Sequence, residues 1–420
     1  MPKWSSMDLF SLISSITFLA AIFAYFNTKF LKLPFTIGLM VMALIFTMIL
    51  LAVGHFVPAL LSEAKAVVHE LDFKSLLLDV MLSFLLFAGA LHTKLDLLKV
   101  NRGPILMLAT LGVLISAALV GFAIYYLLIL LNYPVDLIYC FLFGSLIAPT
   151  DPIAVLGILK QIGAPKNLET KIVGESLFND GVGVVVFLVL LSIAREGIDQ
   201  VSAMEIAALF AEEIVGGVVL GLAFGYGAFQ LMRSIDHYET EVIITIALVM
   251  GVYSLASYLH FSGPLAVVIA GLLVGNKSPK AAWSKASQLY IDKFWEMLDV
   301  FLNAILFVLI GLEMLIVEIN GLYLLVGLLA IPIGLIARYI AVSGPVIIFK
   351  KHLDFAPKTA FLLTWGGLRG GISIALALSL GEGMQRELFL TTTYVVVVFS
   401  IIVQGLSIGK VYRKVLASEK

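Results

Sequence analysis

The sequence predicts an all-α integral membrane protein, and three observations lead to this fold class. Of the 420 residues, 61% are hydrophobic and 13% are charged, whereas a soluble domain is typically about half apolar and about a quarter charged. Apolar runs long enough to cross the roughly 30 Å hydrocarbon layer as helices of about 20 residues recur along almost the whole chain. No polar stretch is long enough for a separate soluble domain, so we treat residues 1–420 as one membrane domain.

Hydropathy places thirteen candidate transmembrane helices along the chain. They cover about residues 9–27, 33–53, 74–93, 104–131, 136–158, 171–194, 207–231, 240–260, 263–276, 296–319, 322–349, 359–381 and 388–410. The stretches 55–67 and 277–293 are too polar to span, and we predict surface or interfacial helices there. The first apolar run is not followed by a small-residue cleavage site, so we expect it to be retained as a helix.

Basic residues fall on alternate connections between these spans, which predicts the orientation of the chain. One side holds twenty of them: Lys29, Lys32, Lys94, Lys99, Arg102, Lys160, Lys166, Lys171, Arg233, Lys277, Lys280, Lys285, Lys293, Lys350, Lys351, Lys358, Lys410, Arg413, Lys414 and Lys420. The other side holds Lys3, Lys65, Lys74, Arg195 and Arg386. Because positive connections tend to stay in the cytoplasm, we expect a multi-pass protein of the cell (inner) membrane with its N-terminus outside and its C-terminus cytoplasmic.

Two segments far apart in the chain resemble each other and indicate an internal repeat. LDVMLSFLLF at 78–87 and LDVFLNAILF at 298–307 match at six of ten positions, 220 residues apart. An odd number of crossings separates them, so the copies run in opposite directions, which predicts inverted repeats over about 9–194 and 240–410 with a linker helix at 207–231. The match alone is also what chance similarity between apolar segments would produce. The same offset sets Asp151 opposite Gly371, and in transporters built this way two interrupted helices form the ion or substrate site.

Composition excludes several other classes of protein. The net charge of -1 and the absence of a basic tail argue against nucleic acid as a partner. The single cysteine, Cys140, can form neither an intrachain disulfide nor a paired-thiolate metal site, and the six histidines show no metal-ligand spacing. We therefore expect no cofactor, and the bilayer is the predicted surrounding.

A helix break is predicted in the fifth span, in the run SLIAPTDPIAVLGIL. Pro149 and Pro152 flank Thr150 and Asp151, and each proline removes a backbone donor and disfavours helix at the residue before it. Asp151 can then cap the half-helix that begins at Pro152, while the freed carbonyl of Thr150 can coordinate a cation. The alternative is that Asp151 acts only as that cap.

The sixth span carries a polar cluster in the run GESLFNDGVG. Glu175 and Asn179 are four residues apart, as are Ser176 and Asp180, so the pairs share neighbouring stripes of one helical face. Asp180 lies roughly 14 Å from the cytoplasmic end of the span by helical rise, which is near the bilayer midplane. Burial there disfavours the ionised carboxylate unless it binds a proton or a cation. The alternative is a cluster that only holds helices together, although such contacts usually use uncharged side chains.

Two arginines also lie inside predicted spans. Arg338 stays ionised at any physiological pH, so deep in its span it requires a counter-charge, and Glu175 is the best candidate. The alternative is that Arg338 extends to the membrane surface. Arg369 lies in a glycine-flanked break and can support the scaffold by donating to freed carbonyls. A second tier of buried polar residues favours structural pairing: Asp79, Asp299, Asn303 and Glu313.

At these residues the sequence resembles the monovalent cation:proton antiporter family that contains NhaP-type transporters and animal sodium/proton exchangers. The likeness extends over essentially the whole chain. Its specific marks are TDP at 150–152, GESLFND at 174–180, the arginine of LIARYIAV, and GGLRGG at 366–371.

The resemblance implies a sodium/proton antiporter fold of 13 helices with inverted six-helix repeats, in which spans five and twelve unwind and cross. It implies a mobile core of about 104–194 and 322–410, a dimerisation part of about 9–93 and 207–319, and a homodimer. Asp180, Asp151, Ser176 and Thr150 look like the monovalent-cation site, Glu175 with Arg338 looks like a stabilising ion pair, and the Asn179–Asp180 pair is typical of electroneutral relatives.

The expected function is therefore electroneutral exchange of a monovalent cation, expected to be sodium, for a proton by alternating access, and not an enzymatic reaction. A potassium/proton antiporter of the same family and a cation channel are the alternatives. An intramembrane hydrolase fits less well, since GESL lacks the GxSxG pattern. The chain ends soon after its last span, so we expect no regulators that bind a long tail. Ala88 stands where some relatives carry an acid, so pH sensing at that position is not expected.

Overall fold

The computed structural model describes residues 9–70, 73–151, 155, 159, 166–196, 203–317, 320–349 and 358–417. These residues form helices and connecting segments, with one isolated β-bridge between Asp151 and Leu368. Within this part of the chain, ten helices are long and apolar enough to cross a membrane. The predicted all-α membrane fold is confirmed.

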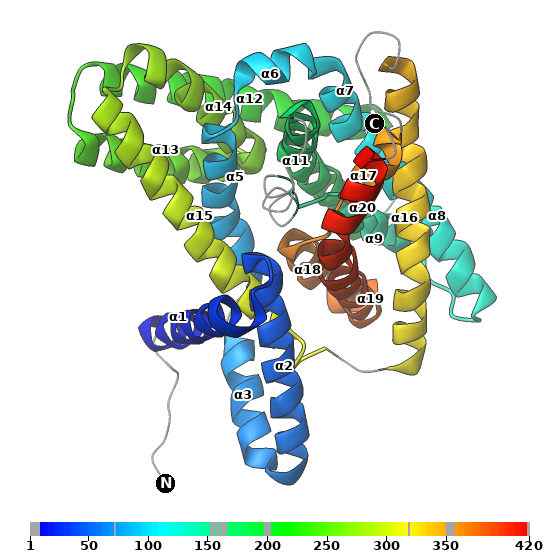
Figure 1. Ribbon diagram of the computed structural model, residues 1–420. Helices are drawn as coiled ribbons and strands as arrows, with labels where there is room; N and C mark the ends of the chain where they lie inside the picture. Colours follow the sequence, from blue (N-terminus) through cyan, green and yellow to red (C-terminus); the bar gives the residue numbers. More distant parts are fainter. Residues whose placement is uncertain are drawn as a thin grey trace.

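The helices of the first half follow the predicted spans closely (Figure 1). They are α1 (Leu9–Phe26), α2 (Phe35–Phe56), α3 (Pro58–Glu70), α4 (Phe73–Ser75), α5 (Leu82–Leu91), α6 (Leu95–Val100), α7 (Arg102–Met107), α8 (Val113–Leu130), α9 (Leu137–Ile147) and α11 (Lys166–Glu196). π-Helical turns continue or join several of them at Asn27–Leu31, Leu76–Met81 and Leu108–Gly112.

The second half continues in the same way. It contains α12 (Ala203–Arg233), α13 (Tyr238–Tyr258), α14 (Gly263–Ala281), α15 (Lys285–Glu313), α16 (Gly321–Phe349), α17 (Thr359–Trp365), α18 (Gly371–Leu378), α19 (Arg386–Phe399) and α20 (Gly405–Ala417), with a π-helical segment Ser400–Gln404 between the last two.

The predicted interfacial helix at 277–293 is wrong. Residues up to Ala281 belong to α14, and α15 begins at Lys285, so the polar stretch forms the two facing helix ends and the turn between them. Ser284 explains the boundary, because its hydroxyl accepts a hydrogen bond from the Ser287 amide at 3.2 Å and thereby caps α15. The other polar stretch does form a helix of its own, α3, which packs against α2.

Close helix packing relies on small residues. Gly275 of α14 lies against the backbone of Leu91 in α5, and Gly144 of α9 lies against the backbone of Ala117 in α8. Removing the side chain lets two helix backbones approach, which is the usual way that membrane helices gain contact.

Buried apolar side chains form two large groups in the described residues. One joins α5 with α12, α13, α14 and the start of α15, and the other joins α1, α2, α8, α9, α11 and α16–α20 with the end of α15. The helix α15 therefore passes from one group into the other. The predicted division into a mobile core and a dimerisation part stays a prediction.

Two broken spans meet in the middle of the fold. The fifth span ends as α9 at Ile147, and the twelfth is divided into α17 and α18, which Figure 1 shows as separate segments. Of these two, α18 packs against α9. The connecting segments pair there, since the Asp151 amide donates to the Leu368 carbonyl at 2.8 Å. The breaks that the repeat offset sets opposite each other in sequence thus lie side by side. Pro152 lies outside the described residues.

Candidate ion site at the crossing of two broken helices

The break after α9 is held against α11 by two polar side chains. The Asn179 amide donates to the Thr150 hydroxyl at 2.9 Å, and its carbonyl oxygen accepts from the Thr150 backbone amide at 3.4 Å. The Ser176 hydroxyl donates to the Thr150 carbonyl. That carbonyl has a second lone pair, so the hydrogen bond does not prevent it from also coordinating a cation. All three residues are buried.

Glu175 and Arg338 form a buried ion pair. The guanidinium Nη2 lies 2.6 Å from Glu175 Oε1 and 2.7 Å from Oε2, and both side chains are 2% exposed. Asn179 also donates to Glu175 Oε1, at 3.0 Å. Arg338 reaches the second break as well, because an ideal Cβ on Gly367 would lie 3.1 Å from its Nε and 3.1 Å from Thr150 Cγ2. Arg338 therefore lies between the carboxylate of α11 and Gly367 of the second break, and Gly367 in turn packs on the Thr150 side chain of the first break.

Asp180 lies one turn further along α11 and is 8% exposed. The carboxylates of Asp151 and Glu175 are close enough to act on it electrostatically. Asp151 lies against Gly370, where an ideal Cβ would come within 2.6 Å of its Oδ2. An unneutralised charge on Asp180 is unfavourable in this buried position, so binding of a proton or a cation there is favourable.

Side chains of the last helical segments of the chain form hydrogen bonds with the backbone groups around the break between α17 and α18. The Gln404 amide donates to the Trp365 carbonyl at 3.1 Å, Tyr412 donates to the Leu362 carbonyl at 2.8 Å, and the Arg369 amide donates to the Ser400 hydroxyl at 2.9 Å. The Arg369 side chain donates to the Gly367 carbonyl at 3.0 Å. Backbone groups freed by a break inside a membrane need such partners.

Several residues of this region differ from the prediction or were missed by it. Lys171, predicted on a cytoplasmic connection, is buried in α11 at 2% exposure. The supporting role of Ser400 and Gln404 was missed, although polar side chains within the last predicted span were a usable signal. Asn303 does pair with Asp299, donating to its carboxylate at 3.1 Å. The Asp79 side chain lies outside the described residues.

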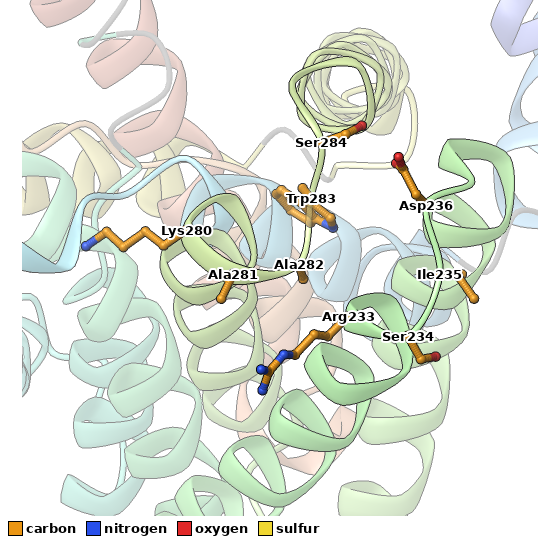
Figure 2. A pocket seen from close by; sticks show the side chains of 9 residues that line it. All are labelled: Arg233, Ser234, Ile235, Asp236, Lys280, Ala281, Ala282, Trp283 and Ser284. Atoms are coloured by element: carbon orange, nitrogen blue, oxygen red, sulfur yellow. The ribbon is translucent and has the colours of Figure 1, made fainter.

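A cavity of about 580 Å³ lies elsewhere, between the turn after α12 and the turn after α14 (Figure 2). It is lined by residues 233–236 and 280–284, which include the basic Arg233 and Lys280 and the acidic Asp236. This open surface hollow shares no lining residue with the site described above. A much smaller cavity of about 20 Å³, the size of one water molecule, adjoins Arg369.

Curated relatives match the chain over almost its full length. It is 46% identical over 417 residues to the Na(+)/H(+) antiporter NhaP of Pseudomonas aeruginosa, covering 98% of each chain. It is 34% identical over 396 residues to the Na(+)/H(+) antiporter NhaH of Halobacillus dabanensis, covering 92% of this chain and 93% of that one.

A solved structure shares the fold. The sodium proton antiporter MjNhaP1 of Methanocaldococcus jannaschii at pH 8 superimposes with a TM-score of 0.76 at 22% identity, over 98% of this chain and 100% of that one. The family model described as "Sodium/hydrogen exchanger, transmembrane" matches residues 16–414. The chain therefore belongs to the sodium/hydrogen exchanger family.

Proposed function

We propose that the chain exchanges a monovalent cation, with sodium the expected ion, for a proton across the cell membrane. The observation that carries the proposal is the buried polar cluster of Thr150, Glu175, Ser176, Asn179 and Asp180 at the crossing of two broken helices. Relatives named Na(+)/H(+) antiporters, at 46% and 34% identity, support the same activity.

Asp180 is the proposed exchanging group. In one half of the cycle it holds a proton, and in the other it releases that proton and holds a cation, with oxygen ligands from Asp151, Ser176 and Thr150. Because the two ions compete for one carboxylate, one cation moves for each proton and the exchange is electroneutral. Alternating access then requires that only a loaded, charge-compensated site crosses the membrane.

Glu175 and Arg338 have a different proposed role. Their two charges neutralise each other, and a hydrogen bond from Asn179 fixes the carboxylate, so this pair holds the site without exchanging ions. Arg369 supports the second break. The moving part is proposed to be about 104–194 and 322–410.

We further propose that about 9–93 and 207–319 form the static part of a homodimer. The helix α12 supports this assignment, because only 11% of the residues in its most apolar stretch are buried within one chain. Such an apolar face is covered either by lipid or by a second copy of the chain.

The test is dye-reported proton flux in proteoliposomes challenged with sodium, potassium or lithium chloride. We expect Asp180→Asn to abolish cation-driven flux, while Asp96→Asn, which removes an exposed carboxylate, leaves it unchanged. Exchange retained by Asp180→Asn would refute the assignment. A flux that responds to potassium but not to sodium would favour the potassium alternative.

Charge balance is tested in the same vesicles. An imposed membrane potential should leave the exchange rate unchanged if one cation moves per proton. A cation current under voltage clamp without proton coupling would instead indicate a channel.

A further inference from the structure

The helix α15 carries a polar face that the proposed exchange does not use. Asp299, Asn303, Leu306 and Ile310 are spaced four, three and four residues apart, so they lie on one face of the helix. Leu306 and Ile310 pack on Gly371, where an ideal Cβ would lie 2.5 and 3.3 Å from their Cδ1 atoms. This face is therefore directed at the first residue of α18, next to the crossing of the broken helices. In Figure 1, α15 runs from beside α13 toward α2 and α18.

Asn303 has an oxygen that the described residues do not satisfy. Its side chain is 1% exposed, and its amide nitrogen donates to the Asp299 backbone carbonyl at 2.8 Å and to the Asp299 carboxylate at 3.1 Å. Its carbonyl oxygen has no hydrogen-bond partner among those residues. The reverse orientation of the amide would set oxygen against two oxygens, so the hydrogen bonds fix the assignment. A buried acceptor is thus left unpaired beside a carboxylate.

The charges around Asp299 also favour a bound cation. Asp299 lies close enough to Asp151 for the two carboxylates to repel each other. Asp151 in turn adjoins Gly370, directly before the glycine on which α15 packs. A cation near Asp299 would relieve this repulsion and supply the missing partner of Asn303, since carboxylate and carbonyl oxygens are the ligands that hard cations prefer.

Two partly exposed polar side chains, His92 and Asp292, lie toward the end of α15 that carries Lys285. His92 acts electrostatically on Asp299, and its Nε2 lies 4.0 Å from Asp292 Oδ1. The side chains of His92 and Asp292 are 42% and 41% exposed. Asp292 is seven residues from Asp299, roughly 10 Å along the helix.

We propose that Asp299 and Asn303 form a second site for the transported monovalent cation, through which it passes between the Lys285 end of α15 and Asp151. The proposal rests on the proposed exchange function. The site is asymmetric: it serves access from one face of the membrane only.

The test compares half-saturating sodium concentrations on the two faces, in everted and in right-side-out membrane vesicles. Asp299→Asn should raise the half-saturating concentration about three- to tenfold on the face that carries the α14–α15 turn and leave the other face unchanged. Maximal rate should be retained. Asn303→Leu should act in the same direction, and Asp299→Glu, which keeps the carboxylate, should stay near wild type.

Glu296→Gln is the matched control, because it removes the same charge one turn away on an exposed part of α15, where the carboxylate pairs with Lys293. It should leave both concentrations unchanged. If Asp299 has only a structural role through its pairing with Asn303, its variants lower the amount of folded protein or the maximal rate, and the half-saturating sodium concentration does not change on one face alone. That result would overturn the proposal. Wild-type vesicles without exchange would refute the proposed function instead.

Discussion

Arg338 is buried at 1% exposure, and the carboxylate that neutralises it also receives a hydrogen bond from Asn179. Asn179 in turn holds Thr150 through its other amide proton and its carbonyl oxygen. The ion pair and the helix break are therefore parts of one hydrogen-bonded network, and loss of one member leaves buried groups of the others unsatisfied.

Glu175→Gln should destabilise the protein by about 3–5 kcal/mol, because it leaves a buried guanidinium without its counter-charge. Thermal unfolding in detergent measures the change. The double variant Glu175→Gln, Arg338→Met should recover part of the loss, since it removes the stranded charge. Glu296→Gln, which breaks an exposed pair with Lys293, should cost no more than about 1 kcal/mol. A Glu175→Gln protein as stable as wild type would show that the pair does not hold the fold.

Residue types and spacing were enough to predict which charged side chains inside the spans need a partner of opposite charge. A permanently ionised arginine inside an apolar span demands an acid, and Glu175 was the candidate at a compatible depth. Contacts from other spans were not predictable in the same way. Gly367 packs against Arg338, and Ser400 accepts a hydrogen bond from the Arg369 amide. Both contacts depend on how helices distant in sequence are arranged, and residue spacing along one helix carries no information about that arrangement.

Among the elements, α11 is the one that positions most of the site. Its Gly183 faces the break after α9, and a methyl group there would run into the ring of Pro149. A proline ring cannot rotate away as a flexible side chain can. The glycine therefore sets how closely α11 approaches the broken span.

Gly183→Ala should cost about 1–3 kcal/mol through overpacking and should slow cation-driven proton flux. Gly251→Ala is the matched control within α13, where no heavy atom of the described residues lies within 4 Å of the new methyl group. That change should be neutral or stabilise the helix by up to about 1 kcal/mol, because alanine is the better helix former. Equal effects of the two variants on stability and flux would contradict the proposed contact.

Prolines and glycines predicted the broken spans because they act locally, on the backbone of their own segment. The 277–293 stretch was assigned wrongly for a related reason. Its polarity is real, but two helix ends that extend past the apolar layer are as polar as one helix lying on the surface. The two arrangements differ only in the position of the turn, which is set by Ser284 at the start of α15.

At the scale of the whole molecule, the distribution of basic residues predicts which ends of the helices face the cytoplasm. The α12–α13 turn should be cytoplasmic, and the α8–α9 turn should face outward. Cys140, the single native thiol, is buried and contributes little background to thiol labelling.

Single cysteines introduced at two exposed turns test this orientation in intact cells. Ser234→Cys in the α12–α13 turn should resist a membrane-impermeant maleimide until the membrane is opened, whereas Asn132→Cys in the α8–α9 turn should react at once. Labelling in the opposite order would invert the predicted topology.

The join between the two broken spans has a consequence for how such a protein can diverge. The Asp151 amide and the Leu368 carbonyl are main-chain groups, so every amino acid other than proline at position 151 can form the same hydrogen bond. Side chains beside the join can be exchanged while the crossing keeps its geometry. Mutation can thus retune which ion is selected without dismantling the framework that presents the ligands.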